Sequence, residues 1–163
     1  MNKRVLITGG GRGIGAATAR YLAGQGYHLC LNYRYDRASA EALVAEIRAQ
    51  HPVSCIAVQA DVSVEAEVVR LFEEMDARLG TITHLVNNAG ILLPQMRVLE
   101  MSAERINKTL TTNVTSCFLC CREAVRRMAP GGAIVNVSSA AARLGSPGEY
   151  VDYAAAKGAI DVL

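Results

Sequence analysis

The sequence predicts an α/β fold with a doubly wound parallel sheet, in which helices cover both faces of the sheet. Two observations support this prediction. Short apolar runs alternate with segments of helical periodicity along the whole chain, and the chemically distinctive residues follow the ends of the apolar runs. Alternating strands and helices form parallel sheets with right-handed crossovers, whose ligands bind at the carboxyl ends of the strands. The sequence contains no internal repeat or linker, so we expect a single domain over residues 1–163.

The composition is that of an ordinary globular domain. Hydrophobic residues make up 51% of the 163 residues and charged residues 20%, and the formal net charge is +2. This small charge argues against nucleic acid or an anionic membrane as the main partner. The apolar run behind the basic N-terminus is too short for a secretory signal, and no uncharged apolar run reaches the roughly 18 residues that span a bilayer.

The five cysteines do not predict a disulfide framework, because their number is odd and their spacing is irregular. Cys117 and Cys120 form a C-x-x-C pair within a helical run, but neither a second pair nor a nearby histidine completes a zinc site. We therefore interpret these thiols as small buried apolar groups. We expect no metal, and we expect the protein in a reducing cytoplasm.

The first half of the chain contains three strand–helix units. Glycines follow the first and third helices as C-terminal stops, and Ser63 precedes the third helix as its expected N-cap. Apolar residues three and four apart line one face of the second and third helices. The expected strands are residues 3–8, 27–33 and 54–59, and the expected helices are residues 13–23, the segment around Ala40, Leu43, Val44 and Ile47, and the segment around Val68, Leu71, Phe72, Met75 and Leu79.

The second half continues the pattern with two more strands and two helical segments. The longer helical segment is expected in two pieces, with Asn113 in its middle. Polar residues follow both strands, which places them at the carboxyl edge of the sheet. In order, these elements are a strand over residues 82–86 that leads into Asn87-Asn88-Ala89-Gly90, a helical segment over residues 102–128, a strand over residues 133–137 followed by Ser138 and Ser139, and a helix from Tyr150 onward.

A glycine-rich loop separates the first strand from the first helix, with the spacing Gly9-x-x-x-Gly13-x-Gly15. Glycines let the backbone approach a pyrophosphate closely, and the N-terminus of the following helix offers free N–H groups and a positive dipole end. Since the loop lies between a strand and a helix, as such a motif requires, we predict that it binds a dinucleotide.

The end of the second strand indicates which dinucleotide binds. Sites for NAD usually place an acid there to bind the ribose 2′-hydroxyl, whereas this strand ends in Asn32-Tyr33-Arg34. Arg34 and Arg12 suit a 2′-phosphate, because guanidinium groups bind phosphate in a fork geometry. We therefore predict NADP as the cofactor. Asp36 lies close to Arg34 in the sequence, so NAD is the alternative.

Tyr153 and Lys157 are the candidate catalytic pair. Three alanines separate them, and residues i and i+4 of a helix lie on one face. A free tyrosine titrates at about pH 10, too high for acid–base work at neutral pH, and a neighbouring ammonium group favours the phenolate. The pair is thus a candidate proton donor and acceptor. Taken alone, the same spacing also fits an amphipathic helix with a solvated lysine.

Together these motifs resemble those of the short-chain dehydrogenase/reductase family, and most of all its bacterial glucose 1-dehydrogenase and 3-oxoacyl-carrier-protein reductase members. The resemblance extends from Lys3 to Leu163 and implies a Rossmann fold. It rests on Thr8-Gly9-x-x-x-Gly13-Ile14-Gly15, Asn87-Asn88-Ala89-Gly90, Asn113, Ser138-Ser139 and Tyr153-x-x-x-Lys157, which occur in this order.

The resemblance implies a role for each matching residue. Tyr153 resembles the general acid/base, and Lys157 resembles the lysine that supports it and binds the nicotinamide ribose. Ser139 resembles the serine that hydrogen-bonds the reacting oxygen; because it precedes Tyr153 by 14 residues, one more than we expect, Ser138 is the second choice. Asn113 resembles the residue that holds a water in the proton relay.

The residues expected to bind the cofactor come from the loop, the strand ends and the resemblance together. Among them, Asp61 and Val62 match positions that contact adenine. The full set is Gly9, Gly11, Arg12, Gly13, Ile14, Gly15, Arg34, Asp61, Val62, Asn87, Ala89, Gly90, Tyr153 and Lys157.

The implied activity is hydride transfer between NADP(H) and a secondary alcohol or ketone, a small-molecule substrate whose identity the sequence leaves open. Family members form homodimers or homotetramers, and we expect the same here. They are also considerably longer, so we expect this 163-residue chain to be C-terminally incomplete, without the last strands and the substrate region. The alternative is a non-catalytic dinucleotide-binding fragment or relative.

Overall fold

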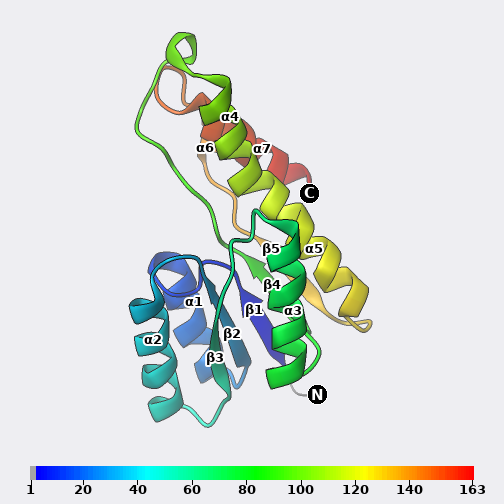
Figure 1. Cartoon of the computed structure of the whole chain (residues 1–163). Coiled ribbons are helices and arrows are strands. Elements are labelled where there is room, and N and C mark those ends of the chain that lie inside the picture. Colours follow the sequence, from blue (N-terminus) through cyan, green and yellow to red (C-terminus); the bar gives the residue numbers. More distant parts are fainter. Residues whose placement is uncertain (1–2) are drawn as a thin grey trace.

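Five parallel strands form the centre of the structure, a computed structural model that describes residues 3–163 (Figure 1). Their spatial order is β3-β2-β1-β4-β5, and all neighbouring pairs are parallel. Each connection therefore crosses from one end of the sheet to the other. The strands are β1 (Arg4–Ile7), β2 (His28–Tyr33), β3 (Cys55–Gln59), β4 (His84–Asn87) and β5 (Ala133–Asn136).

The winding of the chain reverses beside β1. The chain steps from β1 outward to β2 and β3, and β4 then pairs with the other side of β1, so that Val5 lies between Leu29 and His84. Such a reversal opens a crevice at the carboxyl ends of the strands, where ligands bind. The predicted doubly wound sheet is thus confirmed. The glycine-rich loop after β1 and the segment after β4 lie on either side of the reversal.

Helices cover both faces of the sheet. α1 and α2 lie on one face, and α3 and α5 lie on the other. The helices of the structure are α1 (Gly13–Gly24), α2 (Arg37–Gln50), α3 (Glu65–Leu79), α4 (Ala103–Leu110), α5 (Ser116–Arg127), α6 (Ala141–Leu144) and α7 (Val151–Val162). Successive residues of β1 point to opposite faces. Val5 and Ile7 belong to an apolar cluster with α1 and α2, whereas Leu6 belongs to a second cluster with α3 and α5. All three side chains are fully buried, so burial on both faces fixes the register of this strand.

A long helical run links the sheet to a part of the fold beyond its carboxyl edge. α5 packs beside α3 on the sheet, while α4 extends past the sheet and packs against α7 (Figure 1). The two helices are joined by a π-helical turn, η2 (Thr111–Thr115), through which the backbone stays helical. The two expected pieces are therefore observed as α4 and α5, with Asn113 in the turn between them, and that turn is itself helical.

Ser63 is not the N-cap of α3. Val64 occupies that position without a side-chain hydrogen bond, and the N–H and hydroxyl of Ser63 donate to Asp61 Oδ1 at 3.0 and 2.6 Å. The hydroxyl therefore shapes the turn before the helix. Neither α6 nor the short 3-10 turn η1 (Val98–Glu100) was among the expected elements.

The cysteines fit their interpretation as small buried apolar groups. All five cysteines are free thiols, and Cys117 and Cys120 are buried as small apolar groups. Over the described residues, every helix is too short or too polar to cross a membrane.

Candidate functional site

The glycine-rich loop is held in place by close backbone contacts. The Gly9 N–H donates to the Asn32 side chain at 3.3 Å, and the Gly10 N–H donates to the Asn32 carbonyl at 2.8 Å, which ties the loop to β2. A β-carbon on Gly15 would collide with the Gly9 carbonyl oxygen and would lie 2.8 Å from Asn88 Nδ2. Position 15 therefore requires glycine, because any side chain would push the loop away from the first turn of α1.

The N-terminus of α1 is open to an anion. Arg12 occupies the N-cap without a side-chain hydrogen bond, and the first turn contains no acidic residue. Arg12 and Ile14 are exposed at this end of the helix. The free N–H groups of a helix N-terminus and its positive dipole end attract a phosphate. This open backbone end, beside a loop that glycine at position 15 lets pack closely, fits the pyrophosphate of a dinucleotide.

The segment after β4 is locked to the same loop. The Thr8 hydroxyl oxygen accepts the N–H groups of Asn88 and Ala89, both at 3.0 Å, and Asn88 Nδ2 donates to the carbonyls of Thr8 and Gly9 at 3.0 and 3.1 Å. These bonds cross the point where the winding reverses. The two segments that flank the crevice therefore form one rigid wall.

Asn87 extends this wall toward β5. Its side-chain nitrogen donates to Asn136 Oδ1 at 3.0 Å, and its carbonyl accepts the Val137 N–H at 2.9 Å. Asn87 is only 7% exposed, so it needs such partners. The ends of β4 and β5 are thereby held together at the edge of the crevice.

Asn113 lies in the π-helical turn and fastens the loop that follows Gly90. Its side chain accepts the Ile91 N–H at 2.8 Å and donates to the Ile91 carbonyl at 3.0 Å. A β-carbon on Gly90 would lie 2.6 Å from Asn113 Oδ1, so glycine is required for this approach. The wider π turn, a feature often found at functional sites, places the buried amide at the crevice.

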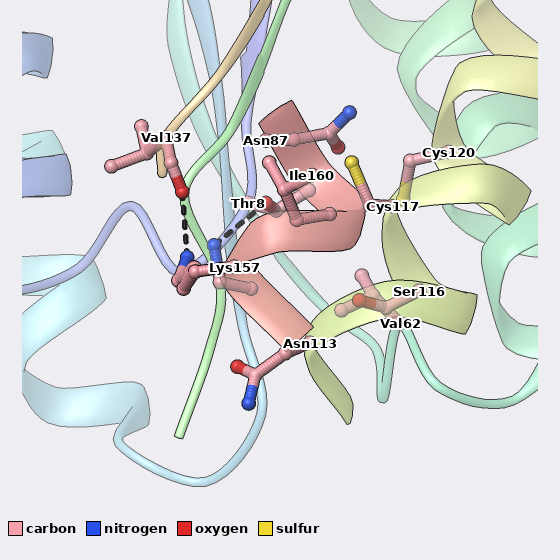
Figure 2. Close-up of a pocket in the computed structure, with 11 residues that line it drawn as sticks. Thr8, Val62, Asn87, Asn113, Ser116, Cys117, Cys120, Val137, Lys157 and Ile160 are labelled. Atoms are coloured by element: carbon pink, nitrogen blue, oxygen red, sulfur yellow. Dashed lines mark hydrogen bonds between the residues drawn. The ribbon is translucent and has the colours of Figure 1, made fainter. Parts of the chain in front are cut away.

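Tyr153 and Lys157 lie one turn apart on α7, as the sequence predicts. Tyr153 is half-buried, and the Lys157 ammonium lies 5.7 Å from the centre of its ring. The ammonium donates to the Val137 carbonyl at 2.6 Å, as Figure 2 shows. Lys157 also lines a cavity of about 10 Å³ together with Asn113, Ser116 and Thr8, about the space that one water molecule needs.

The Lys157 side chain is almost completely buried, with 5% of its surface exposed. Burial lowers the pKa of Lys157, because a low-dielectric environment disfavours the ammonium form; Cys117 and Asp161 oppose that shift. The hydrogen bond to Val137 gives the buried ammonium one fixed partner. An ammonium has three N–H donors, so two remain for other partners.

The two serines after β5 differ in what their hydroxyls do. Ser138 donates its hydroxyl to the Lys157 carbonyl at 3.2 Å, which commits it to holding α7. Ser139 Oγ accepts the Ala141 N–H at 3.2 Å, and over residues 3–163 its own O–H has no acceptor. Of these two hydroxyls, only that of Ser139 keeps a free donor among the described residues.

The adenine end of the predicted cofactor site lies at the ends of β2 and β3. Arg34 Nη2 forms an ion pair with Asp61 Oδ2 at 2.6 Å, whereas Arg12 forms none with the described part of the chain. Val62 is buried, with 6% exposure, and packs into the core beside α3. The structure therefore brings Arg34 to Asp61, and leaves Arg12 on the glycine-rich loop.

Arg105 and Asp152 form a buried ion pair that the sequence analysis missed. Arg105 Nε lies 3.0 Å from Asp152 Oδ2, and the Thr109 hydroxyl donates to the same oxygen at 3.1 Å. The side chains are only 10% and 2% exposed. Asp152 directly precedes Tyr153, so the pair fixes the start of α7 to α4. In the sequence, only the position of Asp152 next to Tyr153 could have pointed to this ion pair, because nothing distinguishes Arg105 from other arginines.

A family model described as short chain dehydrogenase matches residues 3–163. The chain is 55% identical over 163 residues to the uncharacterized oxidoreductase YgfF of Escherichia coli (strain K12), covering 97% of this chain and 66% of the relative. It is 36% identical over 162 residues to the 3-oxoacyl-[acyl-carrier-protein] reductase FabG of Staphylococcus aureus (strain N315), covering 98% of this chain and 65% of that protein. The chain thus spans about two thirds of the length of these relatives.

Solved structures agree with the family match. A short-chain dehydrogenase from Burkholderia cenocepacia in complex with NADP superposes with a TM-score of 0.91 and 35% identity, over 97% of this chain and 64% of that one. A blue fluorescent protein from a metagenomic library in complex with NADPH gives the same TM-score, identity and coverage.

Proposed function

The chain belongs to the short-chain dehydrogenase/reductase family, and from this membership we propose that it is an oxidoreductase that transfers a hydride between NADP(H) and a secondary alcohol or ketone. The observation that carries the proposal is the position of Lys157. Its hydrogen bond to Val137 holds the Tyr153–Lys157 pair at the carboxyl end of β5. The glycine-rich loop lies at the same edge of the sheet. One crevice therefore holds both the expected cofactor-binding loop and the candidate catalytic pair.

The residues support a proton-transfer role at a carbonyl oxygen. NADPH, when bound, supplies the hydride that the carbonyl carbon receives. The Tyr153 hydroxyl gives its proton to the oxygen, and the neighbouring Lys157 ammonium stabilises the phenolate that remains. The Ser139 hydroxyl, which has no acceptor within the described residues, donates to the same oxygen as charge develops on it. Asn113 lines the cavity beside Lys157 and would hold a water that returns a proton.

Two features favour NADP over NAD. Arg12 and Arg34 lie at the glycine-rich loop and the end of β2, and two structures similar to this one hold NADP or NADPH. Asp36, the acid on which the NAD alternative rests, is already engaged: its carboxylate accepts the Ser39 N–H at 3.0 Å and the Ser39 hydroxyl at 2.7 Å as the N-cap of α2. An occupied carboxylate is a weaker partner for a ribose hydroxyl.

The proposal extends to the organisation of the protein. Residues 1–163 are one dinucleotide-binding domain, and α5 carries Phe118 and Val125, which are 53% and 67% exposed one heptad apart. Two exposed apolar side chains on one face of a helix support association with a second copy of the chain. The cytoplasm is the proposed location, in keeping with five free thiols.

A panel of ketones and secondary alcohols, assayed with NADPH, NADH and their oxidised forms, tests the proposed function. We expect reduction of at least one ketone that is faster with NADPH than with NADH. Binding of NADPH without turnover across the whole panel would contradict the proposal and would favour a dinucleotide-binding module instead. A second readout is thermal stability, because a ligand that binds only the native state raises the melting temperature.

A further inference from the structure

We propose that Asp61 limits the preference of the protein for NADPH over NADH, because its carboxylate competes with the 2′-phosphate for the Arg34 guanidinium. This inference rests on the proposed NADP(H) function and adds a residue that tunes it. Arg34 directly follows β2 and Asp61 follows β3, and these strands are neighbours in the sheet. The ion pair therefore spans two adjacent strand ends at the edge where the cofactor is expected.

Asp61 is the fixed member of the pair. Its Oδ1 atom accepts both the N–H and the hydroxyl of Ser63, at 3.0 and 2.6 Å, and its own N–H donates to Glu67 Oε2 at 2.7 Å. The Asp61 side chain is only 15% exposed. The second oxygen, Oδ2, is thereby aimed at Arg34.

Arg34 is the more exposed member of the pair. Its side chain is 41% exposed, and its guanidinium lies 4.6 Å from the ring centre of Tyr35, which is itself 80% exposed. A long side chain that rests on an exposed ring and on one carboxylate can exchange partners without disturbing the core. The Arg34 guanidinium can therefore leave Asp61 for a phosphate.

The Asp61 carboxylate reduces the binding free energy that a 2′-phosphate contributes, in either of two ways. It must give up the guanidinium, or it remains beside the phosphate as a like charge. Arg12 forms no ion pair among residues 3–163, and the carboxylate near it, Asp36, is held by Ser39. Removal of the Asp61 charge is therefore expected to strengthen NADPH binding more than NADH binding. The expected change in the affinity ratio is about two- to fivefold, the range measured for partly exposed ion pairs.

The test is a double-mutant cycle on the dissociation constants of NADPH and NADH. Asp61→Asn keeps the size of the side chain and an oxygen that accepts from Ser63, and Arg34→Gln removes the guanidinium. We expect Asp61→Asn to raise the NADPH/NADH affinity ratio about two- to fivefold when Arg34 is present, and to leave the ratio unchanged in the Arg34→Gln protein. Melting curves identify any variant that does not fold.

Asp36→Asn is the matched control for loss of a nearby negative charge. Asp36 lies near Arg12 and caps α2, and asparagine caps a helix equally well. We expect its effect on the ratio to be the same with and without Arg34. A ratio that falls or stays constant in Asp61→Asn, or that rises equally without Arg34, would overturn the inference while leaving the proposed function intact. Failure of the unaltered protein to bind either nucleotide would instead overturn both.

Discussion

The Lys157 ammonium donates to the Val137 carbonyl at 2.6 Å, and the Lys157 carbonyl accepts the hydroxyl of Ser138 at 3.2 Å. Two bonds of opposite direction thus join α7 to the residues that follow β5. They fix the helix against the end of the sheet, so that Tyr153 and Lys157 cannot turn away from the crevice. The lysine therefore acts both as a tie in the fold and, in our proposal, as a charge beside the tyrosine.

Lys157→Met is expected to lower kcat for ketone reduction about 100-fold or more, because the ammonium that favours the phenolate is lost. It also leaves the half-buried Val137 carbonyl without its side-chain donor, which costs about 1–3 kcal/mol of stability. Steady-state assays with NADPH and thermal melts measure the two effects. Lys108→Met removes an exposed lysine on α4 and serves as the control. Equal activity in both variants would show that the Lys157 charge has no part in the reaction.

Asp152→Asn is expected to destabilise the protein by about 3–5 kcal/mol, because it leaves the buried Arg105 guanidinium without a counter-charge. Denaturant unfolding measures the change. The exposed pair Arg37–Glu41 offers a control, in which Glu41→Gln should alter stability little. The double variant Arg105→Met/Asp152→Leu should recover part of the loss, since two apolar groups bury more easily than one unpaired charge. Equal stability of the single and double variants would argue against a buried ion pair.

The same ion pair predicts how stability depends on pH. Burial raises the pKa of Asp152, but hydrogen bonds from Arg105, the Tyr153 N–H and Thr109 outweigh burial and hold the pKa below its ordinary value. The folded protein therefore binds the proton less readily than the unfolded chain. This contribution to stability is present above the ordinary aspartate pKa of about 4 and is lost as pH falls through the lower folded value. Between pH 5 and pH 2.5, the melting temperature should fall more for the unaltered protein than for Asp152→Asn; parallel curves would refute the assignment.

Gly15→Ala and Gly158→Ala form a matched pair. At position 15 the added β-carbon meets the Gly9 carbonyl and Asn88, so we expect a loss of about 1–3 kcal/mol and weaker NADPH binding. At position 158, inside α7, nothing lies within 4 Å, and alanine should stabilise the helix by about 0.5–1 kcal/mol. Chemical denaturation measures the change in stability of both variants, and NADPH titration measures the change in their NADPH affinity. Unchanged NADPH affinity in Gly15→Ala would show that the loop does not approach the pyrophosphate.

Much of the fold could be predicted because buried strands are short and apolar and are set between helical segments. All five expected strands occur within two residues of the observed bounds, and Gly80 ends α3 as expected. Ser63 was misread because its hydroxyl faces back to Asp61. The π turn at Asn113 was missed because one extra residue in a helical turn leaves the apolar pattern almost unchanged.

The candidate site could be predicted where its residues form short motifs, such as Tyr153 with Lys157. The contacts that support the motifs could not. Arg105 and Asp152 are 47 residues apart, and no local pattern pairs them. Likewise, the engagement of Arg34 with Asp61 depends on the order of β2 and β3 in the sheet. Such pairs depend on tertiary structure, which local periodicity does not determine.

Tyr153→Phe, compared with Tyr150→Phe, tests the proposed reaction most directly. The two tyrosine rings lie 6.0 Å apart at the start of α7, and each substitution removes only a hydroxyl. Hydride transfer from NADPH to a ketone substrate, followed as loss of NADPH absorbance, should slow by about 10²–10⁴-fold in Tyr153→Phe and remain near the unaltered rate in Tyr150→Phe. Retention of NADPH-dependent ketone reduction by Tyr153→Phe would contradict the role of Tyr153 as the proton donor.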